Sequence, residues 1–173
     1  MLAEAPMHAY RMQQLIKERH KDEVVNVAQR NSIYQTIERL LRDGLIQIQA
    51  TERAENRPER TVYEITPIGR DTLREWMKIM LSTPAREFPE FPAALAFLPI
   101  LTQDEAREAL AQRHATLAAQ LSKLDSEVAQ SSTFLHRIFL IEDEYHRAVL
   151  VAELDFVQNT VNDLDSGTLS WKF

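Results

Sequence analysis

The chain has 173 residues, enough for one domain of ordinary size or two small ones, and 45% of them are hydrophobic, enough for a core. It has no cysteine, which excludes disulfides, thiolate zinc sites and cysteine nucleophiles, and no apolar run long enough to cross a membrane. A secretory signal, a glycine-rich phosphate loop and a nucleophile motif are also missing, so we expect a cytoplasmic protein that is not an enzyme and needs no cofactor.

The net charge of −6 is unevenly distributed along the chain. Residues 1–83 hold 13 Lys and Arg against 12 Asp and Glu, a balance of +1, whereas residues 84–173 hold 7 against 14, a balance of −7. The acidity therefore belongs to the C-terminal half. A nearly neutral N-terminal half binds nucleic acid only where its positive charge is concentrated, so we expect its arginines to gather on one surface.

The N-terminal stretch predicts a helix from Pro6 to about Arg19. Proline suits the first turn of a helix. The buried side of this helix would consist of Met7, Tyr10, Leu15 and Ile16. Polar residues then interrupt the pattern, and the β-branched segment VVNV, residues 24–27, predicts a short strand that pairs with a later hairpin.

The stretch from Asn31 to Gly44, NSIYQTIERLLRDG, predicts a short amphipathic helix with marked ends. Asn31 or Ser32 can cap its first turn, and Gly44 stands where a left-handed C-cap forms. Its apolar stripe consists of Ile33, Ile37, Leu40 and Leu41. The opposite face and the residues at its entry have side chains long enough to reach base edges and phosphates in a major groove: Arg30, Ser32, Tyr34, Gln35, Glu38, Arg39 and Arg42.

Two runs of alternating apolar and polar residues follow, at 45–49 and 61–66, and they predict a β-hairpin. The polar tip between them carries Arg53, Arg57, Pro58 and Arg60. In isolation such a tip is equally well explained as a solvated loop. Next to a pair of helices that binds DNA, however, Arg57 and Arg60 are expected to contact phosphates or enter a minor groove.

The order helix, helix, hairpin, helix is that of a winged helix-turn-helix. It resembles the PadR family of bacterial transcriptional regulators. The similarity is carried by PMHAYRM (6–12), NSIYQTIERLLRDGLI (31–46), NRPERTVYEITPIGRDTLREWM (56–77) and FPAALAFLPIL (91–101). It implies that Tyr34 approaches the DNA backbone and that the segment from Pro6 to Tyr10 lies near a phosphate. Residues 1–6 resemble the end of the family's first helix, so we expect a truncated first helix and a natural chain that starts upstream.

Thr66 and Pro67 form an N-cap with proline at the first helical position, and they predict a helix that ends near Leu81. Trp76 lies on the apolar side of this helix. We favour a role for Trp76 as a packing anchor between domains, because tryptophan contributes a large buried area. The alternative is that it stacks against a flat effector; the family resemblance implies a phenolic acid in some relatives.

Three prolines mark a linker at residues 84–92, between a DNA-binding domain of residues 1–83 and a helical dimerisation domain of residues 93–173. A short apolar helix follows the linker. The motif from Thr102 to Glu105 is a capping box that opens a long helix. That helix has a heptad seam, which we interpret as a partner surface: Leu110, His114, Leu117, Leu121, Leu124 and Val128.

A second long helix, from about Phe134 to Leu164, is apolar on two sides. One side holds Ile138, Ile141, Tyr145, Ala148, Val149 and Ala152; the other holds Leu135, Phe139, Leu150, Leu154, Val157 and Val161. One neighbouring helix covers only one side, so we predict a homodimer. Its expected interface is Leu110, Leu117, Leu121, Leu124, Ile138, Ile141, Tyr145 and Val149.

A metal site on this helix is not supported. Glu142 and His146 are four residues apart and could share an ion, but His136 is ten residues from His146 and cannot join them. We interpret this stretch as a solvated acidic run.

The sequence favours a mainly α protein with a small β-wing that acts as a homodimeric repressor, binds a palindromic operator in double-stranded DNA and is released by a small effector. The alternative is a protein-interaction module, in which the winged domain binds a protein. The near-neutral charge of the N-terminal half leaves that alternative open.

Overall fold

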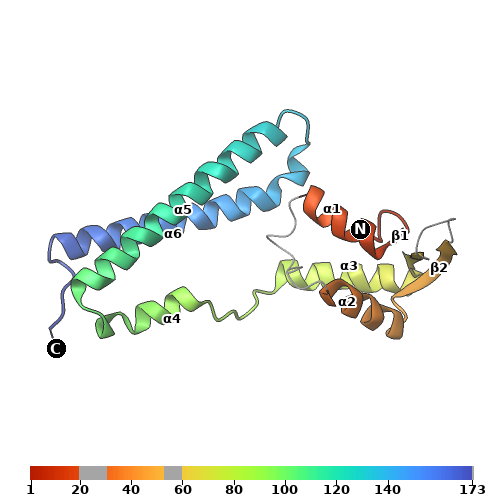
Figure 1. The fold of residues 1–173 in the computed structure, drawn as a ribbon, viewed down its shortest axis with the longest axis horizontal. Coiled ribbons are helices and arrows are strands. Elements are labelled where there is room, and N and C mark those ends of the chain that lie inside the picture. The colour runs from red at the N-terminus through yellow and green to blue at the C-terminus, as the bar shows by residue number, and fades with distance from the viewer. Residues whose placement is uncertain (20–30, 53–59, 173) are drawn as a thin grey trace. The chain divides into compact units, whose positions relative to one another are not determined.

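A computed structural model describes residues 1–19, 31–52 and 60–172 (Figure 1). The fold is mainly α with one small antiparallel sheet, which confirms the fold class expected from the sequence. The chain divides into two compact units, residues 1–86 and 87–173. No helix in the described ranges is long and apolar enough to span a membrane.

The sheet of the N-terminal unit has three strands in the order β1-β3-β2: β1 (Met7–His8), β2 (Ile46–Glu52) and β3 (Arg60–Ile65). The predicted hairpin is therefore present as β2 and β3. The predicted first turn of the N-terminal helix is wrong, because Met7 and His8 pair with Tyr63 and Val62 of β3 and helix α1 (Ala9–Glu18) begins only after them. The strand predicted at residues 24–27 lies outside the described residues.

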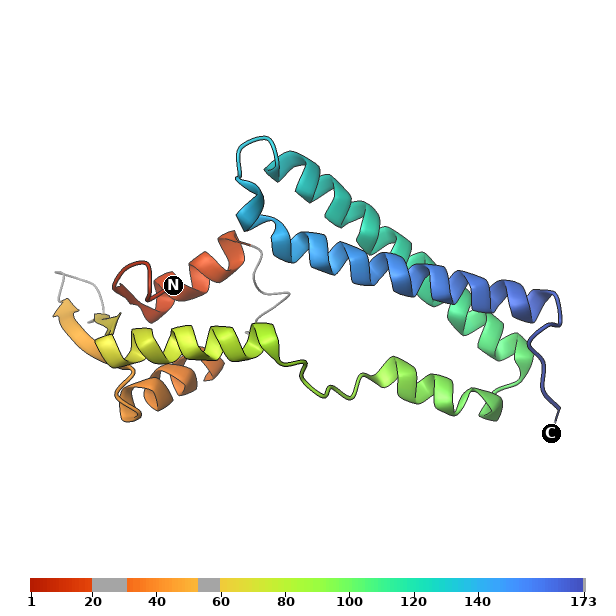
Figure 2. The ribbon, with the colours of Figure 1, turned by 180° about the vertical axis from the view of Figure 1, so that it is seen from behind.

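Helices α2 (Asn31–Arg42) and α3 (Pro67–Ser82) complete this unit beside α1 and the sheet (Figure 2). Its core contains Ala9, Met12, Ile37 and Ile46. The apolar stripe predicted for α2 packs around this core, since Ile33, Leu40 and Leu41 adjoin the buried cluster. Burial of that stripe fixes which side of α2 faces outward.

The C-terminal unit consists of α4 (Glu90–Ala96), a 3₁₀ turn η2 (Leu98–Ile100), α5 (Gln103–Ser131), a second 3₁₀ turn η3 (Arg137–Phe139) and α6 (Ile141–Asp165). The predicted capping box is present: Glu105 N–H donates to Thr102 Oγ1 and Thr102 N–H donates to the Glu105 carboxylate. The hydrogen bonds that the N–H and the hydroxyl of Thr102 donate to the Glu105 carboxylate keep its pKa below the ordinary value. Helix α6 begins later than the predicted Phe134, because residues 137–139 form the 3₁₀ turn.

Helices α5 and α6 lie side by side in an antiparallel pair (Figures 1 and 2). Their shared core joins Leu110, Leu117 and Leu124 of α5 to Leu150, Val157 and Leu164 of α6. The prediction that Leu110, Leu117 and Leu124 form a homodimer interface is therefore wrong, because α6 of the same chain already covers them. Leu121 packs against the same core. Ion pairs such as Arg147 with Asp125, 2.6 Å apart, also connect the two helices.

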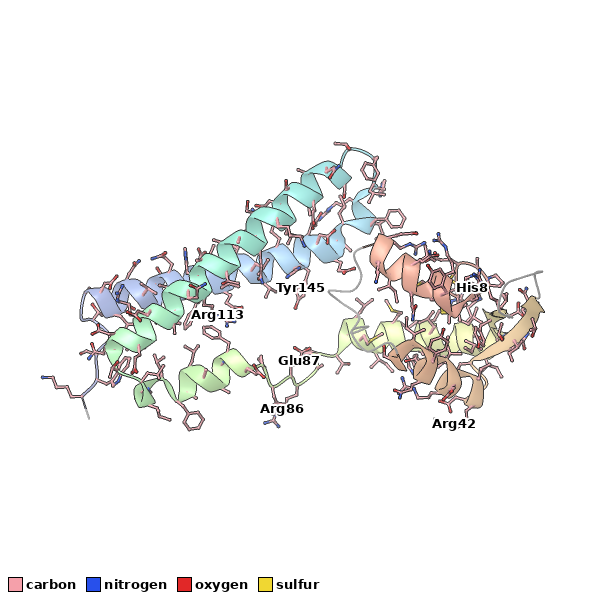
Figure 3. The ribbon with its side chains drawn as sticks, in the orientation of Figure 1. His8, Arg42, Arg86, Glu87, Arg113 and Tyr145 are labelled. Atoms are coloured by element: carbon pink, nitrogen blue, oxygen red, sulfur yellow. The ribbon has the colours of Figure 1, made fainter. Side chains whose placement is uncertain are left out.

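Helix α4 begins inside the stretch predicted as linker. Phe91 packs against the α5–α6 core, where its ring lies edge-on to Phe156, with centroids 6.3 Å apart. The guanidinium of Arg113, labelled in Figure 3, lies 3.7 Å from the centroid of the Phe91 ring. Residues from Glu90 onward are therefore part of the helical unit rather than a free connection.

Candidate nucleic-acid interface

The outward side of α2 is polar and exposed. Ile37 on its inner side is 4% exposed, whereas Tyr34 on its outer side is 51% exposed. Ser32, at the start of the helix, is half-buried. The other exposed residues of this outer side are Gln35, Glu38, Arg39 and Arg42, whereas Ser32 and Thr36 lie at its edge and also line a cavity of the N-terminal unit. Of the residues predicted to contact DNA, Ser32, Tyr34, Gln35 and Arg39 therefore lie on one helix. We call its exposed side the α2 outer face: Tyr34, Gln35, Glu38, Arg39 and Arg42.

The end of α2 is fixed to the start of α3. Gly44 adopts a φ of 68°, and N–H groups of Gly44 and Leu45 donate to the carbonyls of Leu41 and Leu40, the pattern of a Schellman cap. The Thr66 hydroxyl donates to Gly44 O at 2.8 Å, and Thr66 Oγ1 accepts from Gly69 N–H as the N-cap of α3. Both predicted caps are confirmed, and together they position α2 against α3.

The charge on the α2 outer face is mixed. Arg42 Nε lies 3.2 Å from Asp43 Oδ1, but the Arg42 side chain stays 74% exposed (Figure 3). Within the ranges that the structure describes, Arg39 has no ion-pair partner. Glu38 is exposed beside them. Both arginines lie in the last turn of α2. Because their side chains are exposed, their guanidinium groups remain available to an external anion such as a phosphate.

The start of α1 adds a second polar feature. His8 is its N-cap, and His8 Nδ1 accepts a hydrogen bond from Arg11 N–H at 3.0 Å (Figure 3). Tyr10 was predicted on the buried side of this helix, which is wrong: its ring is exposed and stacks against His8, with centroids 6.3 Å apart. The sequence analysis missed this cap, because histidine is not among the preferred N-cap residues. The arrangement orients Tyr10 outward at the positive end of a helix.

Replacing His8 with alanine is expected to lower the free energy of unfolding by about 1 kcal/mol, since the N–H of Arg11 loses its acceptor. Aspartate restores a side-chain acceptor, so His8→Asp is expected to regain most of the loss. Urea denaturation followed by circular dichroism measures both. Equal stability of His8→Ala and the unmodified protein would contradict the capping role.

The wing is described only at its base. Arg60 is exposed at the first residue of β3, in register with Glu52. Arg30, Arg53 and Arg57 lie outside the described residues, so their predicted contacts with DNA remain predictions. Trp76 is 47% exposed on α3, and it lines a cavity within the N-terminal unit.

A metal centre has no support in the described parts of the chain, where no group of three potential ligands converges. The carboxylate of Glu144, between Glu142 and His146, instead receives hydrogen bonds from Arg137 at 2.8 and 2.9 Å. Those bonds keep the pKa of Glu144 below its ordinary value.

Comparison with known proteins identifies the family of the N-terminal unit. Residues 1–75 match the model of the transcriptional regulator PadR-like family. The N-terminal unit belongs to the PadR-like family. The family consists of transcriptional regulators rather than enzymes, which agrees with the lack of an active-site motif in the sequence. A search of curated proteins finds no match to the chain.

Solved PadR-like structures share the whole fold. Bacillus subtilis PadR in complex with operator DNA is 23% identical, with a TM-score of 0.62 over 95% of this chain and 91% of that one. The same protein in complex with p-coumaric acid is 22% identical, with a TM-score of 0.61 over 95% and 90%. The PadR-like regulator BC1756 from Bacillus cereus is 15% identical, with a TM-score of 0.66 over 96% and 94%. The PadR-like unit and the helical unit thus occur together in known regulators.

Proposed function

We propose that this protein is a homodimeric, DNA-binding transcriptional repressor in the cytoplasm that inserts the α2 outer face into the major groove of a palindromic operator. The observation that carries the proposal is the two-sided character of α2, whose apolar side is locked in the core while its arginines and amide face outward. A helix of this kind is what a winged helix-turn-helix presents to DNA. The operator complex of Bacillus subtilis PadR supports it by analogy.

Each group has an expected role. Gln35 offers an amide that can pair with adenine, and Arg39 a guanidinium that can pair with guanine or a phosphate. Tyr34 and Tyr10, which are both exposed, would contact the DNA backbone, with Ser32 at the start of the helix. Arg30, Arg57 and Arg60 would add phosphate or minor-groove contacts from the flanking loop and the wing.

The proposed dimer uses α6. Its exposed apolar residues recur at helical spacing and form one stripe, which we call the α6 stripe: Ile138 in the preceding turn, then Ile141, Tyr145 and Val149. Tyr145 is 73% exposed (Figure 3). Because α5 covers the other side of α6, a second copy of this chain is the partner we propose for the stripe. Residues 93–173 would then be the dimerisation domain, and the two α2 helices would meet successive major grooves about 34 Å apart.

Introducing charge into the α6 stripe is expected to separate the subunits. The double variant Tyr145→Glu, Val149→Glu would place four carboxylates in a desolvated interface, so we expect light scattering to report 20.0 kDa instead of twice that mass. The control is Gln158→Glu, Asn162→Glu, which adds the same charge to exposed positions of α6 outside the stripe. A dimer that survives the first variant would refute this interface.

We further propose a small aromatic effector. The complex of Bacillus subtilis PadR with p-coumaric acid supports the class of ligand. Trp76 is the residue we assign to it, because its partly exposed indole offers a stacking surface.

The test of DNA binding is fluorescence anisotropy with a labelled fragment from upstream of the protein's own gene, read against unlabelled competitor of scrambled sequence. We expect binding that resists the competitor and weakens as salt rises. Purification of the protein bound to another protein, with no preference for the fragment, would instead favour the interaction-module alternative, which the near-neutral N-terminal half suggests.

A further inference from the structure

The segment between α3 and α4 is short and extended. It consists of the seven residues 83–89, all of them exposed, and we call it the connector. Its two ends have extended backbone angles, with φ −123° and ψ 110° at Thr83 and φ −67° and ψ 145° at Pro89. Proline fixes its own φ and keeps the residue before it out of the helical region, so Pro84 and Pro89 stiffen the connector.

Helix α4, which follows the connector, is held against α5 and α6 by its first turn. Within α4, which the structure describes throughout, no residue is fully buried, and Phe91 is the residue that packs against the α5–α6 core. The Phe91 ring contacts the guanidinium of Arg113 on α5. Arg113 Nε in turn donates to Glu153 Oε1 of α6 at 2.6 Å. The position of α4 thus depends on one aromatic side chain and the ion pair beside it.

The chain beyond α4 is held separately. Leu98 of η2 packs against the α5–α6 core, as does Trp171 near the C-terminus. The indole N–H of Trp171 donates to Leu101 O at 3.0 Å, and the Gln103 side chain donates to Trp171 O at 2.9 Å. Loss of the Phe91 contact would therefore release α4 while η2 stays in place.

Release of α4 would lengthen the connector. A helix of seven residues is not stable by itself in water, so α4 would unravel once Phe91 no longer held it. The segment between α3 and η2 would then comprise fifteen residues, 83–97, instead of seven. At about 3.3–3.6 Å per residue, its greatest reach would rise from about 25 Å to about 50 Å. That increase is most of the length of one turn of DNA, about 34 Å.

We propose that docking of α4 through Phe91 sets the length of the connector and thereby the spacing of operator half-sites that the protein accepts. The inference rests on the proposed function, because it requires two DNA-binding units joined through dimerised helical units. With a short, stiff connector, the second unit reaches its half-site at one separation and on one face of the duplex. A longer connector relaxes that restriction, and it dilutes the second unit by about the −3/2 power of its length.

The test measures how the affinity for DNA depends on the distance between half-sites. It uses the fragment from upstream of the protein's own gene, with its natural spacing or with about 5 base pairs inserted, which turns one half-site to the opposite face of the duplex. In the unmodified protein, we expect the insertion to lower the affinity by about 100-fold or more, because the second contact is lost. In Phe91→Ala, we expect a loss of less than about tenfold on insertion, and an affinity about threefold below that of the unmodified protein at the natural spacing.

Two control variants separate connector length from damage to the fold. Phe97→Ala removes the same type of side chain at the end of α4, where Phe97 is 67% exposed, and should behave as the unmodified protein does. Insertion of eight glycine and serine residues between Arg86 and Glu87 extends the connector from seven to fifteen residues and leaves Phe91 in place. This insertion variant should accept the altered DNA spacing as Phe91→Ala does.

Hydrogen exchange followed by mass spectrometry reports on α4 independently of DNA. The amides of α4 should exchange about tenfold faster or more in Phe91→Ala, but at an unchanged rate in Phe97→Ala and in the insertion variant. Unchanged exchange in Phe91→Ala would overturn the anchoring role. A monomeric Phe91→Ala variant in light scattering would overturn the inference too, since Phe91 would then serve the dimer rather than the connector.

The DNA results distinguish failure of this inference from failure of the proposed function. If the unmodified protein binds the natural fragment specifically, but all variants share its response to the inserted base pairs, connector length does not set the spacing and this inference alone is refuted. If the unmodified protein shows no preference for the fragment over scrambled DNA, the proposed function is refuted and the inference falls with it.

Discussion

Arg39→Glu is expected to weaken operator binding by about 1–3 kcal/mol, or roughly 5- to 150-fold, because it replaces an exposed guanidinium that has no ion-pair partner in the described residues with a carboxylate facing the phosphates. The plot of log affinity against log salt concentration has a negative slope, and its magnitude should decrease by about one or more, since one phosphate contact is lost. Anisotropy titrations at several salt concentrations measure both quantities.

Arg74→Glu on α3 is the matched control for this charge reversal. Its side chain is 69% exposed and its nearest acidic partner, Asp71, lies at 3.5 Å. The variant changes the net charge equally but leaves the α2 outer face intact, so its effect on affinity should be clearly smaller. If the two variants lose the same affinity, the loss reflects overall charge, and α2 has no special part in binding.

Gly69→Ala is expected to destabilise the N-terminal unit by about 2 kcal/mol or more, as overpacking against backbone does. An added Cβ would lie 1.9 Å from Leu45 O and 2.8 Å from Leu45 C, and neither atom can move without shifting the chain that leaves α2. Alanine in a helix ordinarily gains about 1 kcal/mol over glycine, which is too little to offset this contact. Urea denaturation read by Trp76 fluorescence in a Trp171→Phe background measures the change.

Ile68→Ala provides the comparison for Gly69→Ala. Ile68 is the neighbouring residue in the first turn of α3 and is largely exposed, so its truncation should change the free energy of unfolding by less than about 0.5 kcal/mol. If Gly69→Ala matched this small value, the close approach of α3 to the exit of α2 would not be a real constraint.

The elements of the N-terminal unit that were predictable from the sequence are those with local signals. The apolar spacing of Ile37 and Leu40, the glycine at position 44 and the pair Thr66–Pro67 each act within a few residues of the feature they specify. Strand β1 has no such signal. It forms because Met7 and His8 meet β3, more than fifty residues away in sequence, and pairing across that distance is not encoded locally.

The helical unit shows a different limit. Periodicity of Leu110, Leu117 and Leu124 indicates that one side of α5 is buried, but it cannot identify the partner. Here α6 of the same chain fills that role. Helix α5 covers only one side of α6, so the exposed α6 stripe is still predicted to bind a second copy although the α5 seam is not part of that interface.

Dimethyl sulfate protection of operator DNA tests most directly whether the α2 outer face lies in the major groove. Methylation occurs at guanine N7, which lies in the major groove. We predict two protected sets of guanines about one helical turn apart, with protection lost in Arg39→Glu under conditions where that variant is still bound. Bound complexes in which every major-groove guanine stays as reactive as in free DNA would contradict the account.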